Sequence, residues 1–149
     1  MRAVVQRVAG AAVRVDGNVV GAIDKGLLVY TGVGADDGEE DIAYIVDKIL
    51  HLRIFPDEAG KMNRDVVQAG GRILLISAFT TQADVRKGRR PSFDGAMPYE
   101  QAESLYERVV AGLRGNNVDV QTGRYREHML VESTNDGPIC ILLDSRRTF

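Results

Sequence analysis

The chain has 149 residues, a net charge of −2 and 44% hydrophobic residues. This length suits one domain, residues 1–149, and the composition excludes a largely disordered chain. The nearly balanced charge excludes nucleic-acid binding by the surface as a whole, so any such binding must rest on a local basic patch.

No apolar run approaches the length of about 20 residues that crosses a membrane. Arg2, Arg7 and Arg14 interrupt any signal-peptide core at the N-terminus. The single cysteine, Cys140, excludes an internal disulfide and fits a reducing compartment. We therefore expect a soluble, cytoplasmic protein without a membrane partner.

The first part of the chain predicts strands. Residues 1–8 are expected to form one strand. Residues 12–23 are expected to form a hairpin, because Asp16-Gly17 separates two β-branched runs. Residues 26–33 form a continuous apolar run that predicts a further strand.

Two amphipathic helices are predicted. The first follows Asp36 or Asp37, either of which can cap it. The second starts at Pro98, because proline is favoured at the first helical position, and it ends at Gly115. The apolar positions recur at helical spacing. They are Ile42, Ile45, Val46 and Ile49 in the first helix, and Ala102, Leu105, Tyr106, Val109, Val110 and Leu113 in the second.

Strands are also predicted between and after the helices. Residues 73–76 follow two glycines and read as a strand that is buried on both faces. Three short strands close the chain at residues 118–122, 128–133 and 139–143. The sequence thus predicts an α/β fold of mixed, partly barrel-like β-sheets with two main helices on one side, in the order βββ-α-ββ-α-βββ.

The end of the strand at 73–76 is the first candidate for chemistry. Ser77 and Thr80 follow it, and a strand end of this kind can present backbone N–H groups to a ligand. The cluster Arg86, Lys87, Arg89 and Arg90 comes next, in a flexible loop that can hold a polyanion, and Phe93 offers a face for base stacking. The alternatives are that the hydroxyls satisfy only the backbone and that the loop is merely solvated.

Other catalytic machinery is not favoured. A serine nucleophile needs a histidine base, but His51 is expected on the solvated face of a helix and nothing in the spacing directs His128 to Ser77. No group of side chains has metal-ligand spacing, so neither a metal nor another cofactor is predicted. Cys140 lies in an apolar run and is expected to be a small buried hydrophobic residue.

Six segments together carry a family resemblance. They are MRAVVQRV at 1–8, LRIFPDEAGKMN at 52–63, GGRILLIS at 70–77, ADVRKGRRPSF at 83–93, VQTG at 120–123 and NDGP at 135–138. Through them almost the whole chain resembles the D-aminoacyl-tRNA deacylases, long called D-tyrosyl-tRNA(Tyr) deacylases. The resemblance implies hydrolysis of the ester between a D-amino acid and the 3′-terminal adenosine of tRNA, as chiral proofreading in translation. It also implies that glycine, which lacks a side chain, is admitted.

The resemblance further implies a homodimer with active sites at its interface. The Gly137-Pro138 bond would be cis and would project into the partner's site, where its carbonyls exclude L-aminoacyl groups. By this resemblance the catalytic residues are Ser77, Phe79 and Thr80. The residues for substrate binding and chiral selection are Arg7, Ala78, Met129, Gly137 and Pro138. The tRNA-binding residues are Arg86, Lys87, Arg89, Arg90 and Phe93.

The chain departs from the family pattern around the expected site. Ala78 replaces glutamine, Thr81 replaces leucine, Cys140 replaces threonine, and Tyr125-Arg126-Glu127 replaces Phe-Gly-Ala. If main-chain N–H groups stabilise the oxyanion, these changes cost little; if the side chain at position 78 orients a donor or a water, Ala78 lowers activity. A second hypothesis is therefore a diverged relative that binds tRNA 3′ ends with weak or no hydrolysis. A third is a generic serine esterase that depends on Ser77.

Overall fold

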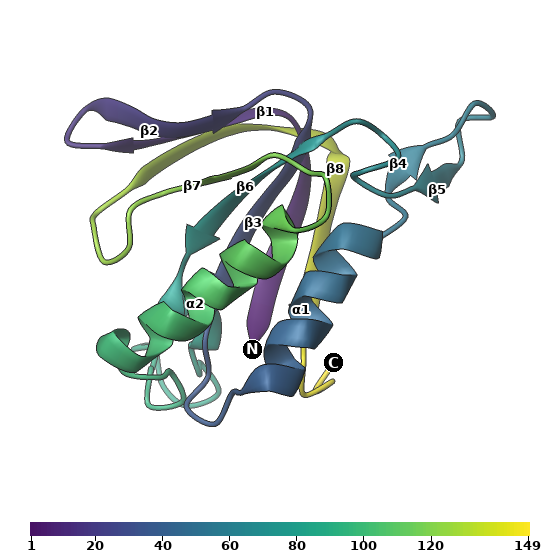
Figure 1. The fold of residues 1–149 in the computed structure, drawn as a ribbon. Helices are drawn as coiled ribbons and strands as arrows, with labels where there is room; N and C mark the ends of the chain where they lie inside the picture. Colours follow the sequence, from purple (N-terminus) through teal and green to yellow (C-terminus); the bar gives the residue numbers. More distant parts are fainter.

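The computed structural model describes all residues, 1–149. A six-stranded sheet carries two helices on one face, and a small hairpin of two strands stands apart from it (Figure 1). The elements are β1 (Arg2–Val15), β2 (Asn18–Ile23), β3 (Gly26–Gly32), α1 (Glu39–His51), β4 (Phe55–Pro56), β5 (Met62–Arg64), β6 (Arg72–Ser77), the 3₁₀ helix η1 (Phe79–Gln82), α2 (Tyr99–Arg114), β7 (Val120–Thr122) and β8 (Leu130–Asp144). None of the helices has the length and apolar character needed to span a membrane.

The sheet runs in the order β2-β1-β3-β6-β7, and β8 also pairs with β1. β1 is antiparallel to β2, β3 and β8, whereas β3, β6 and β7 are parallel neighbours. β3 pairs with the first half of β1 and β2 with the second half, so the long β1 bends the sheet into a nearly closed, barrel-like shape. The predicted α/β class, with a mixed, partly barrel-like sheet and two helices on one side, is confirmed.

Two apolar clusters lie on opposite faces of β6. Ile73 and Leu75 belong to the larger cluster of 23 residues, which includes the buried faces of α1 and α2. Leu74 and Ile76 belong to a cluster of 7 residues inside the curved part of the sheet. The strand is therefore covered on both faces, as its continuous apolar run predicted.

Two long strands replace pairs of predicted short ones. β1 continues through residues 9–11, where we expected a break. β8 joins the predicted strands 128–133 and 139–143, because both pair with β1. The register passes from Gln6↔Cys140 to Val8↔Asn135, so the Asn-Asp-Gly-Pro turn is a bulge within one strand. Between the helices there are three strands where two were expected, because β4 and β5 form their own hairpin.

The helix ends follow the predictions to within two residues. The cap of α1 is Gly38 and not Asp36 or Asp37, and the Asp41 carboxylate accepts the Gly38 N–H at 2.9 Å. α2 starts at Tyr99 with Pro98 as its N-cap, and Gly115 is its C-cap, one residue from the expected limits.

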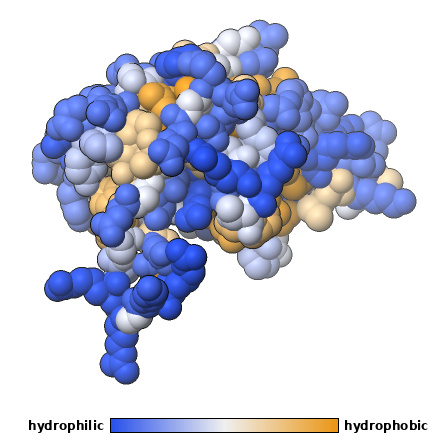
Figure 2. All heavy atoms as spheres, turned by 90° about the horizontal axis from the view of Figure 1, so that it is seen from below, coloured by the Kyte–Doolittle hydropathy of each residue, from blue (hydrophilic) through white to orange (hydrophobic).

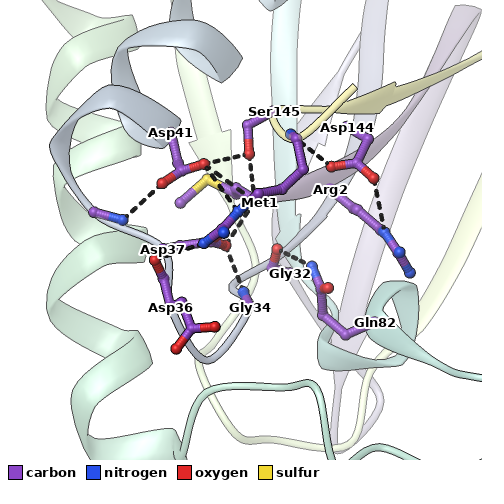
Figure 3. Close-up of polar contacts among 12 residues, drawn as sticks. Met1, Arg2, Gly32, Gly34, Asp36, Asp37, Asp41, Gln82, Asp144 and Ser145 are labelled. Atoms are coloured by element: carbon purple, nitrogen blue, oxygen red, sulfur yellow. Dashed lines mark hydrogen bonds and ion pairs between the residues drawn. The ribbon is translucent and has the colours of Figure 1, made fainter. Parts of the chain in front are cut away.

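The two ends of the chain meet in one polar cluster (Figure 3). The Met1 ammonium lies 2.7 Å from Asp37 Oδ2 and donates to Ser145 Oγ at 2.6 Å. These contacts explain why Asp37 does not cap α1. The oxygen that contacts the ammonium also accepts the Gly34 N–H at 2.5 Å. The cluster therefore fixes the start of β1, the end of β8 and the loop before α1 to one another.

Cys140 corrects a further expectation, because its side chain is exposed. Along β8 the neighbours Ile139 and Ile141 pack against the larger cluster, whereas Cys140 and Leu142 point to the other face. That face is uncovered in this chain, and Leu142 is 58% exposed. A run of four apolar residues here marks a strand with one covered face and not a buried strand.

Candidate active site

A cavity of about 340 Å³ opens where β6 leaves the sheet. Five of the residues singled out from the sequence line it, namely Ser77, Ala78, Phe79, Thr80 and Met129. Its other walls come from β3, from the start of α2 and from the loop between β7 and β8. The strand end predicted to carry chemistry is therefore hollowed, and an ester group can enter it.

The parallel pairing of β3 and β6 positions this strand end. Thr31 stands opposite Ser77, and its carbonyl accepts the N–H of Ala78 at 2.8 Å. The chain then turns into η1, whose hydrogen bonds begin with the Thr81 N–H donating to the Ala78 carbonyl at 3.1 Å. The N–H groups of Phe79 and Thr80 precede this first bond and have no partner within the helix. Two adjacent main-chain donors at a cavity wall are the elements of an oxyanion hole.

Contacts from β3 hold this turn in place. Gln82 Nε2 donates to the Gly32 carbonyl at 2.8 Å. The Thr81 hydroxyl donates to the Ala78 carbonyl at 3.1 Å, so the residue that departs from the family pattern supports the turn locally. A Cβ on Gly32 would lie 2.5 Å from the Ala78 carbonyl oxygen, which explains glycine at that position.

No imidazole is engaged with Ser77. His128 lines the same cavity, but no hydrogen bond joins the two side chains. His51 is exposed on α1, as expected, and its ring contacts Asp47. The geometry therefore offers main-chain donors at the cavity and no assembled Ser-His-Asp triad.

Three tyrosines also line the cavity. Tyr125 was noted in the sequence only as a departure from the family pattern, and Tyr30 and Tyr99 were not singled out. Burial raises the pKa of the Tyr30 phenol, so it stays protonated at neutral pH and can donate a hydrogen bond. Burial also raises the pKa of Tyr125, and its hydroxyl donates to the Tyr99 carbonyl at 3.0 Å. No local sequence pattern marks Tyr30; the pairing Tyr30↔Ile76 places it beside the strand end that opens into the cavity.

The Gly137-Pro138 bond is cis, as the resemblance implied. Gly137 has φ +135°, a conformation that L side chains rarely adopt, and both residues are exposed. The Asn135 side-chain amide braces the bulge by donating to the carbonyls of Arg7 and Ile139 at 3.0 and 2.9 Å. Neither Gly137 nor Pro138 lines the cavity of its own chain.

Arg7 lies on β1, where it contacts this bulge and does not line the cavity. Its Nη1 donates to the Ile54 carbonyl at 2.6 Å, and its Nε lies 3.0 Å from Asp136 Oδ2. That Nε is buried and its N–H is poorly aligned with the carboxylate, so the contact is an ion pair without a good hydrogen bond. Arg7 therefore connects the bulge on β8 to the chain at Ile54.

The basic loop lies beside the cavity. The Phe93 ring meets the Phe79 ring edge-on, with their centroids 5.0 Å apart. Arg86 is held by Asp84, with an N–O distance of 2.6 Å, and the hydrogen bond from this guanidinium keeps the pKa of Asp84 well below its usual range. Lys87, Arg89 and Arg90 are exposed and take part in no ion pair. The face at the lower end of Figure 1 is largely hydrophilic, with a hydrophilic projection that stands clear of the body (Figure 2).

Comparison with known proteins identifies the family. A family model described as D-Tyr-tRNA(Tyr) deacylase matches residues 4–144. The chain belongs to this family. Among the family's curated members, the D-aminoacyl-tRNA deacylase of Anaeromyxobacter dehalogenans is 55% identical over 149 residues, which covers 100% of both chains. The enzyme of the same name from Kosmotoga olearia is 52% identical, again over 100% of both chains.

Solved structures agree with the family's fold. A c-Myc DNA unwinding element binding protein is 40% identical, with a TM-score of 0.92 over 97% of this chain and 98% of that one. A probable eukaryotic D-amino acid tRNA deacylase has a TM-score of 0.78 over 95% of this chain and 97% of that one. The latter is 17% identical and supports the fold alone.

Proposed function

We propose that this protein hydrolyses the ester that joins a D-amino acid to the 3′-terminal adenosine of tRNA, releasing the D-amino acid and free tRNA. The observation that carries the proposal is the 55% identity, over the full length of both chains, with a D-aminoacyl-tRNA deacylase. The cavity at Ser77–Thr80 supports it, because it combines an apolar wall with main-chain donors and is large enough for an aminoacyl group.

The reaction in this proposal relies on main-chain polarity. Water attacks the ester carbonyl carbon, and the oxygen that gains negative charge accepts hydrogen bonds from the N–H groups of Phe79 and Thr80. One such donor typically contributes about 10²–10³ in rate. The carbon–oxygen bond to the adenosine then breaks, and the departing 3′ oxygen takes up the proton that the attacking water gives up, with the neighbouring 2′-hydroxyl of the substrate relaying it. Alanine at position 78 lowers the rate of hydrolysis little in this scheme, since the donors belong to the backbone.

Chiral selection in this proposal requires a second copy of the chain. The exposed cis Gly137-Pro138 bulge of one protomer enters the cavity of its partner, and its carbonyls meet the substrate's amino group. A steric clash then rejects L-aminoacyl groups, which discriminates better than one more attractive contact. Two observations support a homodimer: the bulge does not line its own chain's cavity, and Leu130 and Leu142 are 60% and 58% exposed on the same strand.

The tRNA body is proposed to contact the loop beside the cavity. Lys87, Arg89 and Arg90 have no carboxylate partner and can pair with phosphates, while Phe93 offers an aromatic ring. Arg86 contributes less, because Asp84 already neutralises it. The proposed tRNA substrate supports a cytoplasmic location, because translation takes place there.

The test is hydrolysis of matched substrates by the purified protein. D-Tyr-tRNA should be deacylated rapidly and L-Tyr-tRNA spared, and Gly-tRNA tests whether a substrate without a side chain is admitted. Equal hydrolysis of the D and L esters, or hydrolysis of neither, would defeat the proposal.

A second candidate function is binding of tRNA 3′ ends with weak or no hydrolysis. It is favoured by Ala78, which replaces the family's glutamine at the cavity wall. In this case Ala78→Gln would raise turnover of D-Tyr-tRNA by one or more orders of magnitude. A change of less than about threefold would favour the main-chain mechanism.

A further inference from the structure

The loop between β7 and β8 brings a guanidinium to the mouth of the cavity. Arg126 lines the cavity and has φ +64°. Its Nη1 lies 3.3 Å from Glu100 Oε1, and its Cζ lies 4.9 Å above the ring centre of Tyr99. The hydrogen bond from Tyr125 to the Tyr99 carbonyl fastens the same loop to the start of α2. Two contacts therefore place the guanidinium, and a third hydrogen bond holds the loop that carries it.

Arg126 ends a continuous row of aromatic rings. The rings of Tyr99 and Phe79 meet edge-on with centroids 5.6 Å apart, and Phe79 meets Phe93 in the same way. Phe79 is 37% exposed and Tyr99 is 40% exposed. The row thus leads from the basic loop at 86–90, past the cavity, to the guanidinium. Exposed aromatic rings flanked by cations are the usual means of holding single-stranded nucleic acid.

The Arg126 guanidinium is still free to bind a phosphate in this position. The Arg126 side chain is 53% exposed, and only its Nη1 has a polar protein partner. That partner, Glu100, is 75% exposed, and an ion pair this exposed is weak and easily displaced. The remaining N–H groups can bind a phosphate in the two-pronged geometry that arginine favours.

The left-handed backbone at this residue strengthens the argument. A non-glycine residue at positive φ is uncommon. An arginine therefore occupies a position that suits glycine better, and its half-exposed side chain lines the cavity.

We propose that Arg126 is a positioning residue that binds a phosphate of the unpaired 3′ end of an RNA substrate, whose bases lie along the row Phe93, Phe79 and Tyr99. The proposal rests on the proposed function for the identity of the substrate, a tRNA 3′ end, but not for the hydrolysis itself. Arg126 touches a phosphate at a distance from the ester, so it contributes to substrate affinity and not to the chemical step.

The experiment compares Arg126→Gln with Arg124→Gln. Arg124 is exposed two residues away and does not line the cavity, so it is a matched control. With D-Tyr-tRNA, Arg126→Gln should raise KM about tenfold at unchanged kcat, the effect of one charge-assisted hydrogen bond. With 3′-D-tyrosyl-adenosine, which has no phosphate, KM should be unchanged. The slope of log affinity against log salt for uncharged tRNA should fall by about 0.7.

Two further variants test the charge of Arg126 and the competition from Glu100. Arg126→Lys keeps a point charge and should restore the salt slope, although it loses two-pronged binding. Glu100→Gln removes the competing carboxylate and should lower KM for the tRNA substrate.

The outcomes are distinct. An unchanged KM and salt slope in Arg126→Gln would overturn the proposal, as would an equal rise of KM for 3′-D-tyrosyl-adenosine, which marks a purely structural role. If the wild-type protein hydrolyses neither substrate, the proposed function fails. The salt slope for uncharged tRNA then still decides whether Arg126 binds a phosphate.

Discussion

At the scale of single residues, the donors proposed to act on the ester are two main-chain N–H groups at the cavity wall. Phe79 is the first residue of η1, and Ala78 before it has φ −144° and ψ 89°, outside the α region that a following proline disfavours. Proline is also tolerated at a first helical position, where its missing N–H costs no helical bond. This position therefore allows one donor to be deleted without breaking the helix.

We expect Phe79→Pro to lower kcat for D-Tyr-tRNA by about 10²–10³, because one oxyanion donor is lost. Phe79→Ala removes the ring but keeps the donor, so it should weaken tRNA affinity with a much smaller loss of kcat. Single-turnover kinetics on both variants make the comparison. Equal losses of kcat would show that the ring, and not the N–H, carries the effect.

The basic loop permits a comparison between a neutralised and an unpaired arginine. Arg89→Ala should weaken tRNA binding and reduce its salt dependence by about 0.7–0.9 in slope, because fewer counterions are released. Arg86→Ala should have a smaller effect on both, because Asp84 already holds that guanidinium. Fluorescence titration of uncharged tRNA at several salt concentrations measures both slopes. A larger effect at Arg86 would place the tRNA elsewhere on the loop.

At the scale of elements, local patterns predicted what local interactions determine. β6 and both helices were found because burial imposes a run or a helical period on consecutive residues. β1 and β8 were each divided in two, because their continuity rests on pairing between residues some 130 positions apart, which no local pattern reveals. The exposure of Cys140 follows from the same pairing.

The polar cluster at the chain ends joins three elements and can be tested by one substitution. Asp37→Asn leaves the buried Met1 ammonium without its closest carboxylate, and the Asp37 side chain is only 2% exposed. Removing one partner of a buried ion pair typically costs about 3–5 kcal/mol, so the free energy of unfolding in urea should fall by about that amount. Asp36→Asn is the control: its exposed side chain should contribute less than about 0.5 kcal/mol. If the two variants lower the free energy of unfolding by similar amounts, the ion pair with the Met1 ammonium does not contribute to stability.

Asp144 gives the fold a dependence on pH. Burial alone would raise the pKa of this carboxyl. Hydrogen bonds from Thr148, the Arg146 N–H and Arg2 together outweigh burial and lower the pKa. The folded pKa thus lies below the unfolded value of about 3.9, so the stabilisation is present above that pH and is lost as pH falls through the folded pKa.

Urea unfolding at pH 6 and pH 3 should therefore show a loss of stability on acidification. Asp144→Asn should be less stable at pH 6 and less sensitive to pH. Asp24→Asn, at an exposed carboxylate without a partner, should follow the wild type. An unaltered pH dependence in Asp144→Asn would assign the acid sensitivity to other groups, with Asp41 the next candidate because its pKa is also lowered.

At the scale of the whole molecule, the site predicted from the sequence divides into two parts. The residues that follow β6 gather in one cavity because they are consecutive at one strand end, which sequence reasoning can anticipate, and Met129 joins them from the loop before β8. Gly137 and Pro138 belong to the bulge on β8, and Arg7 contacts this bulge from β1; all three lie outside that cavity. Tyr30 comes from β3, Tyr99 from the start of α2, and Tyr125 and Arg126 from the loop between β7 and β8, and the approach of these elements depends on the finished fold. Only a second protomer can complete a site that uses both parts.

Mixing two defective variants tests this composite site. Gly137→Ala should impair chiral selection, since the added Cβ would lie 2.8 Å from the Ile139 nitrogen at a positive φ, and thermal melting would check that the protomer still folds. In a heterodimer of Phe79→Pro and Gly137→Ala, one site combines both defects. The other combines an intact cavity with an intact bulge. After random exchange of subunits, about a quarter of the wild-type stereoselective activity should return, because the two-fold symmetry makes the sites equivalent. If each chain holds a complete site, mixing restores nothing, and the activity stays at the sum of the two variants measured alone.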